Sequence, residues 1–144
     1  MKEHMIVRVV SKVLMPLMLL YALYVQFHGE YGPGGGFQAG VIFAEGVILY
    51  SMLFGEDLAH RVISRGFIHI LAALGVLLYG GVGVASIVLG KNFLNYDALA
   101  EDPVTGQVMG IILVELGVGV TVASMMMLIF FSFSDRQNIR RIEP

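Results

Sequence analysis

Two glutamates, Glu45 and Glu115, each stand alone in a long apolar run of this chain. The first lies within residues 36–54 and the second within residues 104–134, and neither run contains another formally charged residue. Moving a charge to the centre of a bilayer costs about 2.5–3.5 kcal/mol even on lenient scales. Such a carboxyl is expected to bind a proton, pair with a donor or face a wet cavity, so these residues predict ion or proton handling.

The composition indicates a membrane protein. The 144 residues are 57% hydrophobic and only 14% charged, whereas soluble domains contain about 25% charged residues. The chain has no cysteine, which excludes disulfides, thiolate catalysis and Cys-ligated metals. The net charge of −2 and the lack of a basic arm with interleaved aromatics argue against nucleic-acid binding. We expect no cofactor and no metal site.

Four stretches are long and apolar enough to cross a membrane, which requires about 20 residues each. They cover approximately residues 7–27, 36–54, 66–89 and 106–131. The segments between them are short, so we expect residues 1–144 to form a single domain. The predicted fold class is all-α, an integral membrane bundle of four transmembrane helices. A soluble four-helix bundle is the alternative, and the distribution of charge argues against it.

The basic residues predict the orientation of the spans. Cytoplasmic loops of membrane proteins carry an excess of Lys and Arg. In a four-span arrangement eight of the 9 basic residues share one side and only Lys91 lies on the other. Both termini should therefore be cytoplasmic, in the inner membrane of a bacterial-type cell. The eight residues are Lys2, Arg8, Lys12, Arg61, Arg65, Arg136, Arg140 and Arg141.

Small residues recur at helical spacing in three of the spans, and such rows let helices approach closely in lipid. We expect them to pack helices of this chain together and to meet partner helices as well. The rows are Gly36, Gly40 and Ala44 in the second span, Ala72, Ala73, Gly80 and Gly83 in the third, and Glu115, Gly119 and Ala123 in the fourth.

A glycine-rich segment joins the first two spans, and we interpret it as a structural turn. Its residues are Pro33, Gly34, Gly35, Gly36 and Phe37. Glycine tolerates positive φ and permits close backbone approach, and proline fixes its own φ, so the chain can reverse tightly here. The segment is not a phosphate-binding loop, because no Gly-Lys-Ser/Thr follows it.

Two motifs carry a resemblance to a known family. Residues 28–40, His-Gly-Glu-Tyr-Gly-Pro-Gly-Gly-Gly-Phe-Gln-Ala-Gly, strongly resemble the signature of the MnhB/MrpB subunits of Mrp-type (Mnh, Pha) multisubunit Na+/H+ antiporters. Residues 110–119, Gly-Ile-Ile-Leu-Val-Glu-Leu-Gly-Val-Gly, resemble the fourth helix of that family. The resemblance implies a secondary-transporter subunit rather than an enzyme. Its partners would be other membrane subunits, and the transported ions would be Na+ and H+.

Glu115, Glu45 and His69 are the candidates for an ion path. Each glutamate lies about nine residues into its span, so roughly 14 Å deep, and both should approach mid-membrane. The alternative is a neutral acid that hydrogen-bonds between helices. His69 lies one turn inside the cytoplasmic end of the third span, where it could relay protons near neutral pH or simply bond at the interface.

Three other functions remain open from the sequence. The same module could be a non-redox subunit of a membrane-bound hydrogenase-like complex, since such complexes contain related subunits. The chain could also be a purely structural membrane scaffold. A small homodimeric multidrug exporter also has four spans and one membrane glutamate, but places that glutamate in the first span, where this chain has none.

Overall fold

The computed structural model describes residues 3–29 and 34–142, and side chains within 6–29 and 34–134. Four of its helices are long and apolar enough to span a membrane, which confirms the all-α fold class with four spans. The elements are α1 (Glu3–Phe27), α2 (Gly36–Phe54), α3 (Glu56–Val62), α4 (Arg65–Val88), the 3₁₀ helix η1 (Tyr96–Ala98) and α5 (Pro103–Ile142).

The helix boundaries differ from the predicted spans in two places. A seven-residue helix, α3, occupies the connection after α2, where we predicted only a loop. The last helix is 40 residues long, well beyond the predicted 106–131. It begins where it does because the Asp102 carboxylate accepts hydrogen bonds from the Thr105 N–H (3.0 Å) and hydroxyl (2.8 Å). Pro103 then occupies the first helical position, where proline is favoured.

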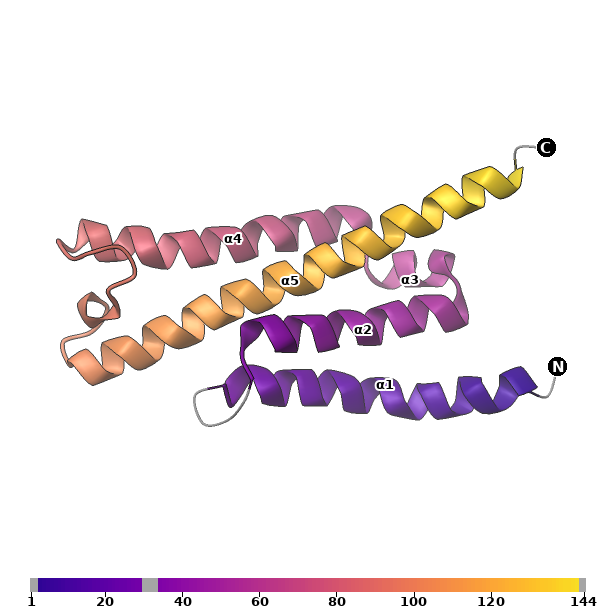
Figure 1. Ribbon diagram of the computed structural model, residues 1–144, viewed down its shortest axis with the longest axis horizontal. Helices are drawn as coiled ribbons and strands as arrows, with labels where there is room; N and C mark the ends of the chain where they lie inside the picture. The colour runs from indigo at the N-terminus through magenta and orange to yellow at the C-terminus, as the bar shows by residue number, and fades with distance from the viewer. Residues whose placement is uncertain (1–2, 30–33, 143–144) are drawn as a thin grey trace.

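The four long helices lie side by side in one layer, in the order α4, α5, α2, α1 (Figure 1). α5 packs against α4 and α2, while α2 packs against α1, so α1 and α4 form the two edges. Both broad faces of the layer are open as a result. Only 17–28% of the residues in each spanning window are buried within the chain. Most of the apolar helix surface must therefore meet lipid or other proteins.

The hydrophobic core lies at one end of the layer, where α3 meets α2, α4 and α5. Here the ring of His60 packs on Phe131 with ring centroids 4.5 Å apart, and His60 Nε2 accepts a hydrogen bond of 3.3 Å from the Arg65 side chain. α3 thus anchors the ends of three spans. The buried residues of this core are Ala44, Ala59, Ile68, Ala123, Met127 and Phe131.

Glycines bring α2 and α5 into backbone contact further along the layer. A Cβ added to Gly36 would overlap the carbonyl oxygen of Glu115, and one added to Gly40 would lie 2.5 Å from the carbonyl oxygen of Gly119. Ala123 is buried on the same row of α5. The small-residue rows predicted for the second and fourth spans therefore do pack against each other.

The row predicted for the third span is not the one that packs against α5. Gly80 has open space around it and Ala73 is exposed. The glycine that meets α5 is Gly75, where an added Cβ would lie 2.8 Å from the Gly117 carbonyl oxygen. The face of α4 that packs on α5 follows a seven-residue spacing instead, which runs through Ile68, Gly75 and Val82.

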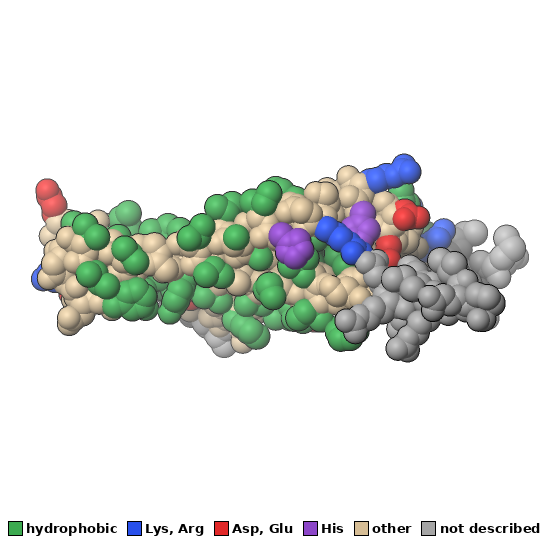
Figure 2. All heavy atoms as spheres, turned by 90° about the horizontal axis from the view of Figure 1, so that it is seen from above, with side chains coloured by type: hydrophobic (Ala, Val, Ile, Leu, Met, Phe, Trp, Pro, Cys, Tyr) green, Lys and Arg blue, Asp and Glu red, His purple; other side chains and the backbone are tan. Residues whose placement is uncertain are grey.

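On the face seen in Figure 2, most Lys, Arg, Asp and Glu side chains lie toward the two ends of the layer, and apolar side chains cover much of the length between them. α1 begins and α5 ends at the same end of the molecule (Figure 1). At that end Arg8 donates a hydrogen bond of 3.3 Å to the Leu53 carbonyl, and the Lys12 ammonium lies 5.5 Å from the centroid of the Phe54 ring. The basic residues of α1 therefore lie beside the C-terminus of α2.

Candidate functional site

Glu115 is half-buried on α5 and lies against the connection between α1 and α2. A Cβ added to Gly29 would lie 3.0 Å from each carboxylate oxygen of Glu115. A Cβ added to Gly35 would lie 3.1 Å from Oε1 of the same carboxylate. Glycines at these two positions leave the space that the carboxylate occupies. The acid is thus held where α1 ends and α2 begins.

The start of α2 shapes the electrostatic surroundings of this carboxylate. Gly36 is the first residue of α2, and it lies directly against the backbone of Glu115. The first N–H groups of a helix have no partner within the helix, and they form the positive end of its dipole. Helix N-termini accordingly favour anionic groups. The backbone of α2 therefore complements a carboxylate at this position.

The glycines of the turn are needed for close approach and not for unusual backbone angles. Gly35 has φ 170° and ψ −175°, an extended conformation that any residue can adopt. The glycines with positive φ in the described part of the chain are Gly55 and Gly90, which lie elsewhere. A Cβ added to Gly34 would lie 2.9 Å from Cγ1 of Val25 on α1. The turn is therefore tight because helices meet there.

The two ends of the predicted turn contribute less to this contact. Pro33 lies outside the described residues. The side chain of Phe37 is 63% exposed, so it projects away from the packed helices. The part of the turn that contacts Glu115 consequently consists of Gly35 and Gly36, with Gly34 packed on α1.

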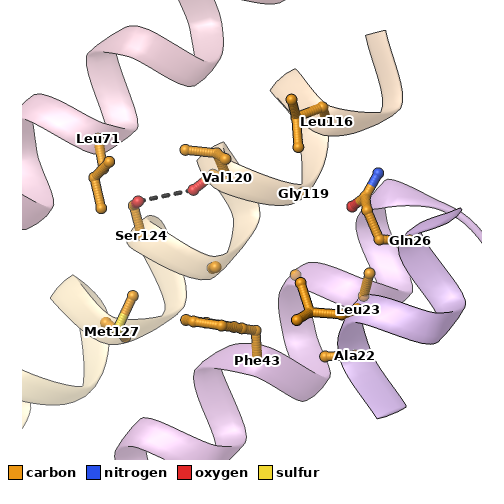
Figure 3. A pocket seen from close by; sticks show the side chains of 13 residues that line it. Ala22, Leu23, Gln26, Phe43, Leu71, Leu116, Gly119, Val120, Ser124 and Met127 are labelled. Carbon is orange, nitrogen blue, oxygen red and sulfur yellow. Dashed lines mark hydrogen bonds between the residues drawn. The ribbon is translucent and has the colours of Figure 1, made fainter. Parts of the chain in front are cut away.

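A cavity of about 210 Å³ lies next to this site, between α1, α2, α4 and α5 (Figure 3). Gln26 lies at its Gly119 end, where the missing Cβ of Gly119 leaves room for the amide. The hydroxyl of Ser124 donates to the Val120 carbonyl at 2.7 Å, and the rest of the lining is almost wholly apolar. The lining therefore offers few of the two to four polar partners that an ordered buried water needs.

Gln26 is a polar residue that the sequence analysis missed. It is the single amide in residues 7–27, which is the signal that could have identified it. Its side chain lies against Gly119, one helical turn along α5 from Glu115. It therefore brings a polar group beside the Glu115 site at the end of the apolar cavity.

Glu45 and His69 are exposed and are not brought together with Glu115. α5 separates α2 from α4 in the layer (Figure 1), and since packed helix axes are 8–10 Å apart, α2 and α4 are roughly 16–20 Å apart. Glu45 lies nine residues beyond Gly36, about 14 Å along α2 from the level of Glu115. The two carboxyls therefore lie at different depths, contrary to expectation, and the three candidates do not form a relay.

The ion-binding capacity of the described region rests on single groups. No three His, Asp or Glu side chains among those described gather closely enough to hold a metal ion. At Glu115 the available oxygens are the carboxylate and neighbouring backbone carbonyls such as that of Gly34, near Gly29. Such hard oxygen groups suit a proton or an alkali cation passing through.

The family of this chain is shown by comparison with known sequences. Residues 6–128 match a family model described as "Domain related to MnhB subunit of Na+/H+ antiporter". The chain belongs to this MnhB family. The matched region contains all three candidate residues and the glycine turn, and the family inferred from residues 28–40 and 110–119 is thereby confirmed.

Individual relatives of this MnhB-family chain match it along most of its length. Proteins named "Putative antiporter subunit mnhB2" from Staphylococcus aureus strains Newman and JH1 are each 32% identical to it over 138 residues. The alignment covers 93% of this chain and 97% of each relative. The similarity therefore extends across all four spans, and the chain is a multi-pass membrane protein of the MnhB family.

Proposed function

We propose that this chain is a small membrane subunit of a multisubunit Na+/H+ antiporter in the inner membrane. Membership in the MnhB family supports this function, as do four spans that bury little of their own surface. An isolated transporter would need a polar route within its own helices, whereas the described cavity beside Glu115 is apolar. We infer that the chain acts as a transporter component, packed against other membrane subunits, and not as a complete transporter.

Within this function, Glu115 is the residue that lines the Na+ or H+ path. The observation that carries this assignment is its position against the glycine turn, where Gly29 and Gly35 leave space around the carboxylate. The first turn of α2 adds backbone N–H groups that complement a negative charge. A carboxylate in such surroundings can bind and release a proton or a cation at the end of two helices.

Substitution of Glu115 tests the ion-path role in membrane vesicles. Glu115→Gln keeps the size and hydrogen-bonding capacity but removes the ionisable group. We expect the complex to assemble at a near-normal level while Na+/H+ exchange falls at least about tenfold, as for loss of a proton-transfer group. Glu101→Gln is the matched control, because Glu101 is exposed in the loop before α5 and its loss should leave exchange unchanged.

The opposite pattern would identify a structural acid. Normal exchange in Glu115→Gln complexes, together with poor assembly of Glu115→Ala complexes, would leave only a packing role, since the alanine removes a buried polar partner. That result would favour the scaffold alternative. Co-purification of the wild-type chain with hydrogenase subunits in mild detergent, in place of antiporter subunits, would instead assign the module to a different complex.

A further inference from the structure

We propose that one face of α2 docks a transmembrane helix of another subunit, and that this helix presents a Lys or Arg side chain to Glu45. The inference rests on the proposed function as one subunit of a complex. The Glu45 face is formed by Gln38, Val41, Glu45, Leu49 and Met52.

Glu45 lies at the centre of its span. It is nine residues from Gly36 and nine from Phe54, the two ends of α2, so about 14 Å of helix separates it from either end. The hydrocarbon core of a bilayer is about 30 Å thick. The carboxyl of Glu45 is therefore near the bilayer midplane, beyond the reach of either aqueous surface.

The neighbours of Glu45 on α2 show which way it points. Successive residues of an α-helix are about 100° apart. Ala44 is fully buried in the core that α2 shares with α5, and a Cβ added to Gly46 would lie 3.0 Å from Leu19 on α1. Glu45 falls between these two contacts, so it points out of the layer and not toward α1 or α5. It is accordingly exposed, as are Gln38 and Met52.

An exposed carboxyl at this depth is costly against lipid, because no water is available to solvate the charge. The rest of α2 carries no ionisable acid or base that could pair with it. A cationic side chain on a facing helix would supply the missing charge, and polar residues within membranes characteristically pair in this way. A cationic partner lets the carboxyl stay ionised in the membrane, so charge complementarity favours an occupant that brings its own Lys or Arg to the midplane.

A second copy of this chain does not provide such a residue. Residues 13–60 and 66–90 contain no Lys or Arg, so the first three spans carry these residues only at their ends. The fourth span has none between residues 92 and 135. A basic group at the height of Glu45 must come from a different polypeptide, which makes this face a site for a heterologous subunit.

Photo-crosslinking in the assembled complex identifies the occupant. A benzoylphenylalanine at Gln38 or at Met52 flanks Glu45 on the same face and leaves the acid intact. We expect both positions to form an adduct with one other subunit, at a transmembrane segment that contains a Lys or Arg. The same crosslinker at Leu77, which is 67% exposed on α4, serves as the control and should not form that adduct.

Charge reversal then tests the pairing itself. Glu45→Lys places like charges together, which costs several kcal/mol, so recovery of the assembled complex should fall at least about tenfold. Reversing the crosslinked partner residue to Glu should restore assembly. Leu77→Lys is the control, because it shows how much a lysine within a span lowers recovery of the complex when Glu45 is intact. Reversing the partner residue to Glu should not restore assembly of this variant.

Each other outcome overturns the inference. The inference is wrong if the adducts form only with lipid, with a second copy of the chain, or with a segment that has no Lys or Arg. It is also wrong if reversing the charge of the partner residue does not restore assembly. The proposed function fails separately, if the wild-type chain does not co-purify with antiporter subunits. A wild-type complex that assembles and exchanges Na+ for H+ without the predicted adduct would reject only the docking site.

Discussion

Glycines, which have no side chain, leave the space that the Glu115 carboxylate occupies. Gly29 and Gly35 come from the end of α1 and the residue before α2, and each leaves room for the same carboxylate. Gly119 does the same for the amide of Gln26, one turn further along α5. Polar groups are thus admitted between helices that otherwise pack through apolar contacts. At the scale of single residues, the distinguishing feature of Glu115 is the room that neighbouring glycines leave around its carboxylate.

Asp102 provides a residue-scale prediction that depends on pH. The hydroxyl and then the backbone N–H of Thr105 lower the pKa of the Asp102 carboxyl below its ordinary value of 3.8. Because the folded pKa is the lower one, the stabilisation is complete above pH 3.8 and is lost as the pH falls through the folded pKa. Asp102→Ala should therefore reduce the hydrogen-exchange protection of the Thr105 amide several-fold at neutral pH.

The wild-type protein should converge on the behaviour of this variant in acid, once the carboxylate is protonated. The measurement is the protection factor of the Thr105 amide in detergent over a series of pH values. Glu101→Ala is the control, because Glu101 is exposed and Thr105 donates its hydrogen bonds to the neighbouring Asp102 carboxylate instead. Equal protection in Asp102→Ala and wild type at neutral pH would show that this cap does not hold the start of α5.

At the scale of elements, α5 organises the layer. It packs extensively on two other spans, α2 and α4, and both contacts use glycine. Gly36 and Gly40 of α2 meet it on one side and Gly75 of α4 on the other. Since association in lipid relies on close packing and not on the exclusion of water, these backbone contacts contribute to the attraction between the spans.

Gly40→Ala should separate α2 from α5. The added Cβ would lie 2.5 Å from the carbonyl oxygen of Gly119, and a backbone atom cannot move aside as a flexible side chain can. Overpacking of this kind costs about 1–3 kcal/mol, so the variant should aggregate at a lower temperature when heated in detergent. Size-exclusion chromatography of heated samples measures this shift.

Gly80→Ala is the control for that experiment. Gly80 lies within α4 and has open space around it, so a methyl group there meets no obstacle and removes the helix-weakening effect of glycine. Its stability should equal or exceed that of the wild type. If the Gly40→Ala protein is as stable as the Gly80→Ala protein, then α2 and α5 can move apart without loss of stability.

At the scale of the whole molecule, the charges define two ends of the layer. Arg8 and Lys12 lie at the C-terminal end of α2, and Arg61 and Arg65 lie at the same end, on α3 and at the start of α4. The opposite end carries the acidic residues near η1 and the start of α5, including Asp97 and Asp102. The excess of positive charge predicts that the first end is cytoplasmic.

Cysteine labelling tests this orientation without background, because the chain has no cysteine. Glu101 and Asn92 are exposed at the acidic end and Ser64 is exposed at the basic end. In intact cells an impermeant thiol reagent should label Glu101→Cys and Asn92→Cys but not Ser64→Cys. Permeabilised cells provide the control, since all three should then react. The reverse pattern in intact cells would refute the proposal that both termini are cytoplasmic.

Much of this protein was determined by its sequence alone. The number of spans follows from hydrophobic length, because each helix must cross the same thickness of lipid. The bounds of α2 follow from the glycine turn before it and Gly55 after it. Residues 28–40 and 110–119 also indicated the family before any contact was known. The small-residue rows that contain Gly36, Gly40 and Gly119 were also evident from their four-residue spacing, although the structure alone showed that these rows meet.

Only the tertiary structure decided how the candidate residues relate to one another. Helical spacing gives the face on which a residue lies, but which helix covers that face depends on the order of the layer. With α5 between α2 and α4, Glu45 and His69 are exposed on helices that are not neighbours. Glu115 lies at the end of α2, and Glu45 lies at its centre, because α5 runs past the turn between α1 and α2. The relative depth of two acids in the membrane therefore depends on how the helices pack. It cannot be obtained by counting residues within one helix.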